Sequence, residues 1–299
     1  MGGARGAACA GREIVTRERE DCDSSKGQER ASLKVSIVNL PGVCVAAAGG
    51  DTDRCVAGGR LLSFSSSGEA DLDVPMTQAV TQLACTRELL VAVAENHRLV
   101  WLDPATGRLL AERAAGDTPR LVAGGGAIWA VDPSTSRVWR IREQGVLDAP
   151  RIAPGIDQAA ADGDRLWWTS RHDTELRDFT RTESIGHGAG ERGAMVVCSN
   201  AVWISVRNGL CRIGAWDAKR GLDMAAPHGP VPFLVCAQGA LVGASASGEY
   251  FALDPRIDAD VRALHGVAPM GPLGHVIAVN EAVWAFPSGK NEAHLIRIR

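Results

Sequence analysis

The stretch Gly126-Ala127-Ile128-Trp129-Ala130-Val131-Asp132 is the clearest copy of an apolar strand that recurs along the chain, usually with Trp in its core. The other cores are Leu90-Val91, Leu166-Trp167, Val202-Trp203, Leu241-Val242 and Val283-Trp284. From Val91 onward the cores lie 38, 38, 36, 39 and 42 residues apart. A period of this length, built from strands and Gly-rich turns, is typical of a β-propeller, because each four-stranded unit covers its apolar faces only by packing against the next.

The repeat count predicts an all-β fold with a single propeller of seven four-stranded blades; six and eight blades are the alternatives. The last repeat, residues 281–299, holds only two strands. We expect residues 33–38 and 43–47 to complete it, so that the two ends of the chain share one blade. This pairing would close the ring and leave no open sheet edge.

Two regions differ in composition. Residues 1–31 mix Arg, Glu, Asp, Gly and Ser with few apolar side chains, which predicts a disordered amino-terminal tail. Residues 32–299 are long enough for one closed all-β domain and are predicted to form the propeller. The tail has no continuous apolar stretch of the signal-peptide kind, and no segment reaches the roughly 18 apolar residues of a membrane span. We therefore expect a cytoplasmic protein.

The net charge of the chain and the motifs that it lacks argue against several classes of function. The net charge is −3 and the Lys and Arg residues are scattered, which argues against nucleic acid or a membrane as partner. The nucleophile elbow Gly-x-Ser-x-Gly, the phosphate-binding loop and the zinc motif His-Glu-x-x-His are all absent. Gly124-Gly125-Gly126 precedes a strand, whereas a dinucleotide-binding loop precedes a helix.

The Trp residues divide into two groups. Trp129, Trp167 and Trp203, with Trp284, share one repeat position, which favours packing between blades over a ligand cage. Trp168 breaks the pattern, as does Trp216. These two are the aromatic residues to test for ligand contact.

The eight cysteines are dispersed, and none has C-x-x-C spacing. Cys85, Cys198 and Cys236 each precede the strand core of their repeat by five or six residues. We expect buried structural thiols, because free Cys behaves as a small hydrophobic residue, and such usage fits a reducing compartment.

Histidines fall in turns that the predicted strand order places on one face of the disc. The candidate catalytic residues are His97, His172 and His228, with the carboxylates Glu95 and Asp173. One interpretation is a concave central site in which His acts as a general base or metal ligand beside a carboxylate. The other is that these are solvated turn residues. The sequence specifies neither a metal nor a cofactor.

The segment Val100-Trp101-Leu102-Asp103-Pro104-Ala105-Thr106-Gly107-Arg108, together with 126–132, resembles repeats of a broad bacterial propeller group. The group includes virginiamycin B lyase-like, quinoprotein-like and YVTN-type lactonase-like proteins. The resemblance covers residues 88–299 and lies in scaffold motifs, so it implies the architecture rather than a reaction.

In the lyase subgroup, a typical repeat has a Trp-Phe-Thr-Glu strand end and a Pro-His-Gly connection, which supply acid–base groups and metal contacts. This chain has Trp167-Trp168-Thr169-Ser170, in which Ser replaces the Glu, and Pro227-His228-Gly229. The resemblance therefore carries over His228 alone.

Two functions follow from these features. The first is a binding propeller that presents one face or its axial pocket to a protein or small-molecule ligand. The alternative is a propeller enzyme, a lyase or hydrolase of a small or cyclic metabolite, with His and carboxylate groups around the axis. The sequence does not specify the partner, substrate or oligomeric state.

Overall fold

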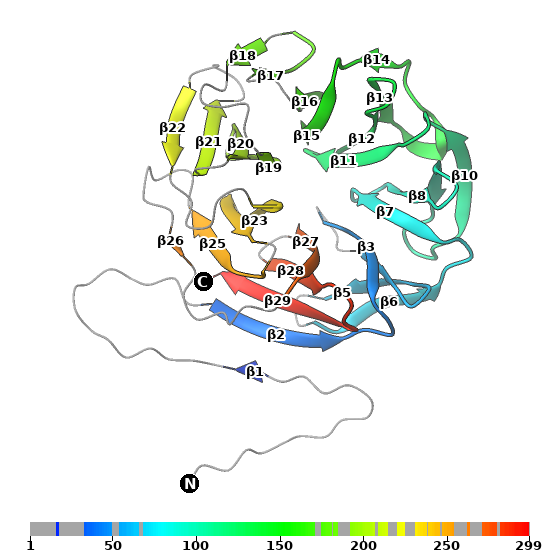
Figure 1. The fold of residues 1–299 in the computed structure, drawn as a ribbon. Coiled ribbons are helices and arrows are strands. Elements are labelled where there is room, and N and C mark those ends of the chain that lie inside the picture. The colour runs from blue at the N-terminus through cyan, green and yellow to red at the C-terminus, as the bar shows by residue number, and fades with distance from the viewer. Residues whose placement is uncertain are drawn as a thin grey trace, which may run out of the picture.

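The computed structural model describes residues 16–17, 33–49, 54–65, 68–170, 175–180, 182–184, 192–206, 209–214, 220–224, 231–237, 239–245, 247–253, 262–263, 271–279 and 282–298. These residues form seven antiparallel sheets arranged radially around one axis (Figure 1). The all-β propeller prediction is confirmed, and the sheets number seven, as the repeat count predicts. Among the described residues, no helix has the length and apolar character to cross a membrane.

Six of the sheets contain four strands that follow one another in chain order from the axis outward. The first three are β3 (Cys44–Ala48), β4 (Arg54–Ala57), β5 (Arg60–Phe64) and β6 (Ala70–Pro75); β7 (Val80–Cys85), β8 (Leu90–Ala94), β9 (Arg98–Leu102) and β10 (Leu109–Ala114); and β11 (Arg120–Gly124), β12 (Ala127–Asp132), β13 (Arg137–Ile141) and β14 (Arg151–Ile152). A short 3-10 turn, η1 (Glu143–Gly145), lies between β13 and β14.

The next three sheets have the same order. They are β15 (Ile156–Asp162), β16 (Arg165–Ser170), β17 (Glu175–Arg177) and β18 (Thr182–Ser184); β19 (Arg192–Cys198), β20 (Ala201–Val206), β21 (Gly209–Gly214) and β22 (Arg220–Met224); and β23 (Phe233–Ala237), β24 (Ala240–Ala244), β25 (Tyr250–Leu253) and β26 (Arg262–Ala263).

The seventh sheet closes the ring with strands from both ends of the chain. It contains β27 (Leu273–Val279), β28 (Ala282–Pro287), β29 (Glu292–Ile298), β2 (Leu33–Asn39) and, at its outer edge, β1 (Thr16–Arg17). β2 pairs with β29 over seven residues, from Leu33 opposite Ile298 to Asn39 opposite Glu292, and the two strands lie side by side in Figure 1. The predicted pairing of the two chain ends is confirmed for residues 33–38.

The second closing segment is placed differently from the prediction. Residues 43–47 were expected to join the last blade, but β3 is the innermost strand of the first. The reason is that the prediction starts each blade one strand too late. The Trp-bearing strand is the second strand of its blade, not the first, so the last repeat already supplies three strands and needs one more.

Burial explains why the Trp-bearing strands dominate the sequence pattern. Every residue of β8 and β12 is buried, because a second strand has sheet neighbours on both sides and a blade on each face. The innermost strand β11 instead contains only exposed and half-buried residues. Its apolar signal is weaker, so the sequence pattern starts each blade one strand too late.

The repeated Trp residues pack between blades, as predicted. Trp129, Trp167, Trp203 and Trp284 are each at most 2% exposed. The indole Nε1 of Trp129 donates a hydrogen bond of 3.2 Å to the carbonyl of Gly163 in the following blade. Trp168 is also buried, beside Phe179 with ring centroids 5.1 Å apart, so it belongs to the interblade core. Trp216 lies outside the described residues.

Candidate functional site: an axial pocket

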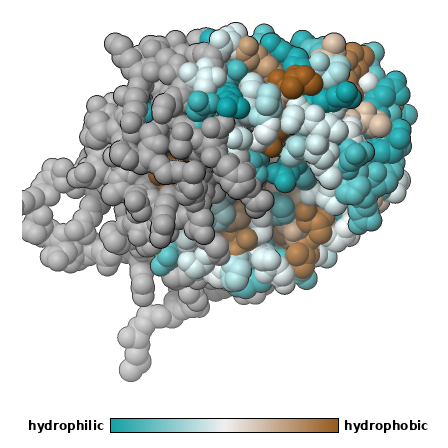
Figure 2. Space-filling model, turned by 45° about the horizontal axis from the view of Figure 1, so that its top comes forward, coloured by the Kyte–Doolittle hydropathy of each residue, from teal (hydrophilic) through white to brown (hydrophobic). Residues whose placement is uncertain are grey.

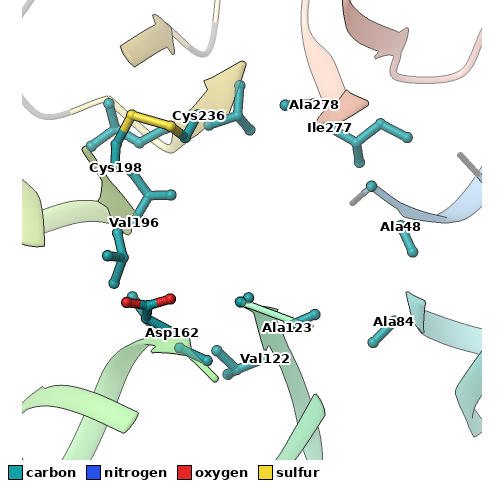
Figure 3. Close-up of a pocket in the computed structure, with 18 of the residues that line it drawn as sticks. Ala48, Ala84, Val122, Ala123, Asp162, Val196, Cys198, Cys236, Ile277 and Ala278 are labelled. Atoms are coloured by element: carbon teal, nitrogen blue, oxygen red, sulfur yellow. A yellow bond between two sulfur atoms is a disulfide. The ribbon is translucent and has the colours of Figure 1, made fainter. Parts of the chain in front are cut away.

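The seven innermost strands surround a pocket of about 980 Å³ on the propeller axis (Figure 3). We call this the axial pocket; it is lined by the carboxyl-terminal parts of β3, β7, β11, β15, β19, β23 and β27 and by several of the turns that follow them. Its size is at the upper end of the range usual for small-molecule sites. Every blade therefore contributes to one concave surface.

Most side chains that line the axial pocket are small and apolar. Examples on four different strands are Ala48, Ala84, Ala123 and Ala278. Each innermost strand ends its sheet, so the edge turned away from the second strand has no ladder partner. Such edges carry backbone N–H and C=O groups outside the sheet ladder, and neighbouring blades bond some of them: the Leu121 N–H donates to Gln82 Oε1, and the Gly124 carbonyl accepts from the Gly163 N–H. The wall thus combines apolar side chains with backbone hydrogen-bonding groups.

Asp162 is the one formally charged residue among the described residues that line the pocket. It ends β15, pairs across the sheet with Arg165 and is half-buried. The backbone of Gly125 approaches it closely: a Cβ at Gly125, which has φ of +57°, would lie 2.5 Å from the Asp162 Oδ1. The wall next to Asp162 therefore depends on a glycine backbone.

A disulfide joins two neighbouring blades at the pocket wall. Cys198 ends β19 and Cys236 lies in β23, with Cα atoms 5.4 Å apart. These strands belong to different sheets, so the bond is a covalent link where no ladder exists. Figure 3 shows the disulfide, Val196 and Asp162 along one side of the pocket.

The three cysteines predicted to be buried thiols therefore differ in the structure. The expectation of free thiols is wrong for Cys198 and Cys236, because equivalent parts of adjacent blades bring them together. Cys85 is a buried thiol outside any disulfide, as expected, and so are Cys44 and Cys55. The sequence did contain a signal, since Cys198 and Cys236 are 38 residues apart, one repeat length.

Glu95 and His97 lie in the turn between β8 and β9, and both are exposed. The backbone N–H of Glu95 donates to the carbonyl of Ala79, just before β7 begins, whereas the pocket is lined by the other end of β7. These two candidates are therefore at the opposite end of their blade from the axial pocket. His172, Asp173 and His228 lie outside the described residues.

Two other histidines lie on strands and have structural partners. His294 Nε2 lies 3.2 Å from Glu292 Oε1, and His294 is 7% exposed. His275 lies on β27, where burial lowers the pKa of its imidazole although a hydrogen bond with the Val45 backbone opposes this. Within the described part of the chain, no group of three or more His, Cys, Asp or Glu side chains is placed to hold a metal ion.

Asp132 joins two turns of its blade. Its carboxylate accepts hydrogen bonds from the Ser134 hydroxyl at 2.6 Å, the Thr135 hydroxyl at 2.8 Å and the Asp117 backbone N–H at 3.2 Å. Burial would raise the pKa of Asp132, but these hydrogen bonds together outweigh it and lower the pKa to about 2. Gly116 has no side chain to collide with this carboxylate. Asp132 is thus a structural anion rather than a free acid.

The surface between the turns carries scattered apolar side chains. On the described part of the face in Figure 2, hydrophobic residues form separate small groups among hydrophilic ones. The large exposed apolar side chains of the described residues are Val43, Val45, Leu109, Leu110, Val146 and Ile152. Scattered apolar residues are ordinary for a protein surface. The axial pocket is therefore the more distinctive feature.

Comparison with known proteins identifies the fold. No family model matches the chain, and no curated protein matches it in sequence. Virginiamycin B lyase from Staphylococcus aureus is similar in structure, with a TM-score of 0.69 and 12% identity over 90% of this chain and 100% of the lyase. BamB from Moraxella catarrhalis has a TM-score of 0.53 and 13% identity over 87% of this chain and 88% of BamB.

A third similar structure is a chain of the mitotic checkpoint complex, with a TM-score of 0.67 and 10% identity over 95% of this chain and 100% of that one. The resemblance to lyase-like propellers is therefore confirmed as a likeness of fold. Propellers this divergent include lyases and members of protein complexes, so the fold alone does not select between the two predicted functions.

Proposed function

We propose that the protein is a ligand-binding propeller whose axial pocket takes a small molecule. The observation that carries this proposal is the cavity of about 980 Å³ to which all seven innermost strands contribute. A concave wall that combines apolar side chains with convergent polar groups is typical of a small-molecule site. The described lining holds no paired acid and base, which favours binding over catalysis.

Ala123 offers a direct way to block the pocket. Its side chain is exposed and lies on the pocket wall, so a larger side chain there would occupy the cavity rather than the interblade core. We expect Ala123→Trp to fold normally and to lose ligand binding. A matched control is Ala114→Trp on the outer strand β10, where the alanine is also exposed but lies away from the axis.

The test is a mass-spectrometric screen of a metabolite library against the wild-type protein and both variants. Ligands that bind the wild type and Ala114→Trp but not Ala123→Trp would support the proposal. Ligands that bind all three proteins equally would contradict it, because their site would lie elsewhere.

The enzyme alternative has one observation in its favour, the partly buried pair of His294 with Glu292. It also retains His97, His172 and His228 as candidate acid–base groups or metal ligands. Metal analysis of the purified protein, with and without a chelator, tests the metal-dependent form of this alternative. Stoichiometric divalent metal, with a lower melting temperature after chelation, would support it. No bound metal and no change in stability when these three histidines are replaced would defeat it.

A cytoplasmic location stays part of the proposal. The Cys198–Cys236 bond bears on it, because disulfides persist mainly in oxidising compartments. Alkylation of thiols in intact cells, followed by peptide mapping, would test the location together with the state of this cysteine pair. Free cysteines in the cell would support a reducing compartment, whereas a fully oxidised pair would argue for an oxidising one.

A further inference from the structure

The carboxylate of Asp162 faces an apolar wall without a cationic partner from the protein. The described residues that line the axial pocket include no Lys, Arg or His. The Asp162 carboxylate also has no hydrogen bond or ion pair to any described residue. A carboxylate in apolar surroundings is costly unless it is paired, and its energy falls when a cation binds.

The charged residues next to Asp162 interact with other groups. Asp164, in the same turn, forms an ion pair with Arg140 of the preceding blade. Arg165, directly opposite Asp162 in the sheet, places its guanidinium 5.9 Å from the centre of the Trp167 ring. Arg140 and Arg165, the cations near this turn, therefore contact other groups, and neither forms an ion pair with Asp162.

The side chains that flank Asp162 are apolar. Val122 and Val196 flank it on the adjoining blades in Figure 3, and Ala160 and Ala161 precede it on its own strand. A ligand that fills this side of the pocket needs an apolar body to contact these side chains. It also needs one group that can pair with the carboxylate.

We propose that the axial pocket binds an organic amine, a molecule with an apolar body and a single protonated nitrogen that pairs with Asp162. This inference rests on the proposed function and adds the chemical class of the ligand. A protonated amine satisfies the carboxylate by charge and by hydrogen bonding, while an apolar body replaces water along the alanine and valine wall.

The test uses three rigid probes of the same shape, adamantylamine, adamantanol and adamantane carboxylate, in isothermal titration calorimetry. The wild-type protein is expected to bind the amine about tenfold or more tightly than the alcohol, the usual effect of a charge-assisted hydrogen bond, and to bind the carboxylate least. Asp162→Asn is expected to remove the preference for the amine. Asp157→Asn, which removes a charge from the same strand outside the pocket, is expected to retain it.

The outcomes separate this inference from the proposed function. If the amine and alcohol bind equally, and Ala123→Trp abolishes both, the pocket binds ligands but the role of Asp162 is overturned. A preference for the amine that persists in Asp162→Asn also overturns that role. If no probe responds to Ala123→Trp, the proposed function fails as well.

Discussion

Reduction of the Cys198–Cys236 bond should destabilise the propeller by a predictable amount. The bond closes a loop of 38 residues, and the chain-entropy model gives ~4 kcal/mol for a loop of this length. The cost should appear in the unfolding free energy, because the bond acts mainly by restricting the unfolded chain. The perturbation is treatment with a thiol-free reductant, or the double substitution of Cys198→Ser and Cys236→Ser.

The assay is unfolding in guanidinium, followed by Trp fluorescence, for the oxidised wild type, the reduced wild type and the double variant. The reductant should shift the wild-type midpoint towards that of the double variant and leave the double variant unchanged, which controls for effects on Cys44, Cys55 and Cys85. A loss of less than about 1 kcal/mol on reduction would refute the reasoning. Peptide mapping that finds Cys198 as a free thiol in the oxidised protein would also refute it.

The remaining predictions concern a buried Trp between blades, the carboxylate that joins two turns, and the strand that closes the ring. Trp129→Phe should cost about 1 kcal/mol for the lost hydrogen bond to Gly163, and Trp129→Ala about 3 to 5 kcal/mol, in chemical unfolding; a Trp129→Phe variant as stable as the wild type would contradict an indole bond between blades. Because the folded pKa of Asp132 lies near 2, its contribution is present above about pH 4 and is lost as the pH falls towards 2. Asp132→Asn should therefore remove about 1 to 2 kcal/mol of acid sensitivity, and an unchanged pH profile of the melting temperature would contradict the role given to its hydrogen bonds. A chain that begins at residue 32 should melt like the full chain, whereas one that begins at residue 43 lacks β2 and should melt roughly 10 °C or more lower; equal melting temperatures would contradict closure by β2.

Much of the fold could be predicted because the second strand of each blade is buried on both faces. Residues 127–132 form a continuous apolar run for this reason, and the run repeats with little change in spacing. The innermost strands were not predicted as the first strand of each blade, because one edge and part of one face of each strand border the pocket. Their mixed pattern, as in β11, resembles a connection between strands rather than a strand.

The site was less predictable because its residues look like ordinary turn or core residues. Asp162 belongs to Asp162-Gly163-Asp164, a sequence that favours a tight turn whatever else the residue does. The pocket wall is made of alanines and valines, which carry no chemical signature. The histidines were predicted as site residues because of their chemistry. Glu95 and His97 nevertheless lie away from the pocket, because the turn after each Trp-bearing strand is at the other end of the blade.

The central claim is that ligands bind on the axis, within the ring of innermost strands. A crystal structure of the protein with the tightest ligand from the metabolite screen tests it most directly. The account predicts ligand density in the axial pocket, in contact with Ala123 and with a nitrogen beside Asp162. Ligand density at the turn of Glu95 and His97, with no ligand in the axial pocket, would contradict it.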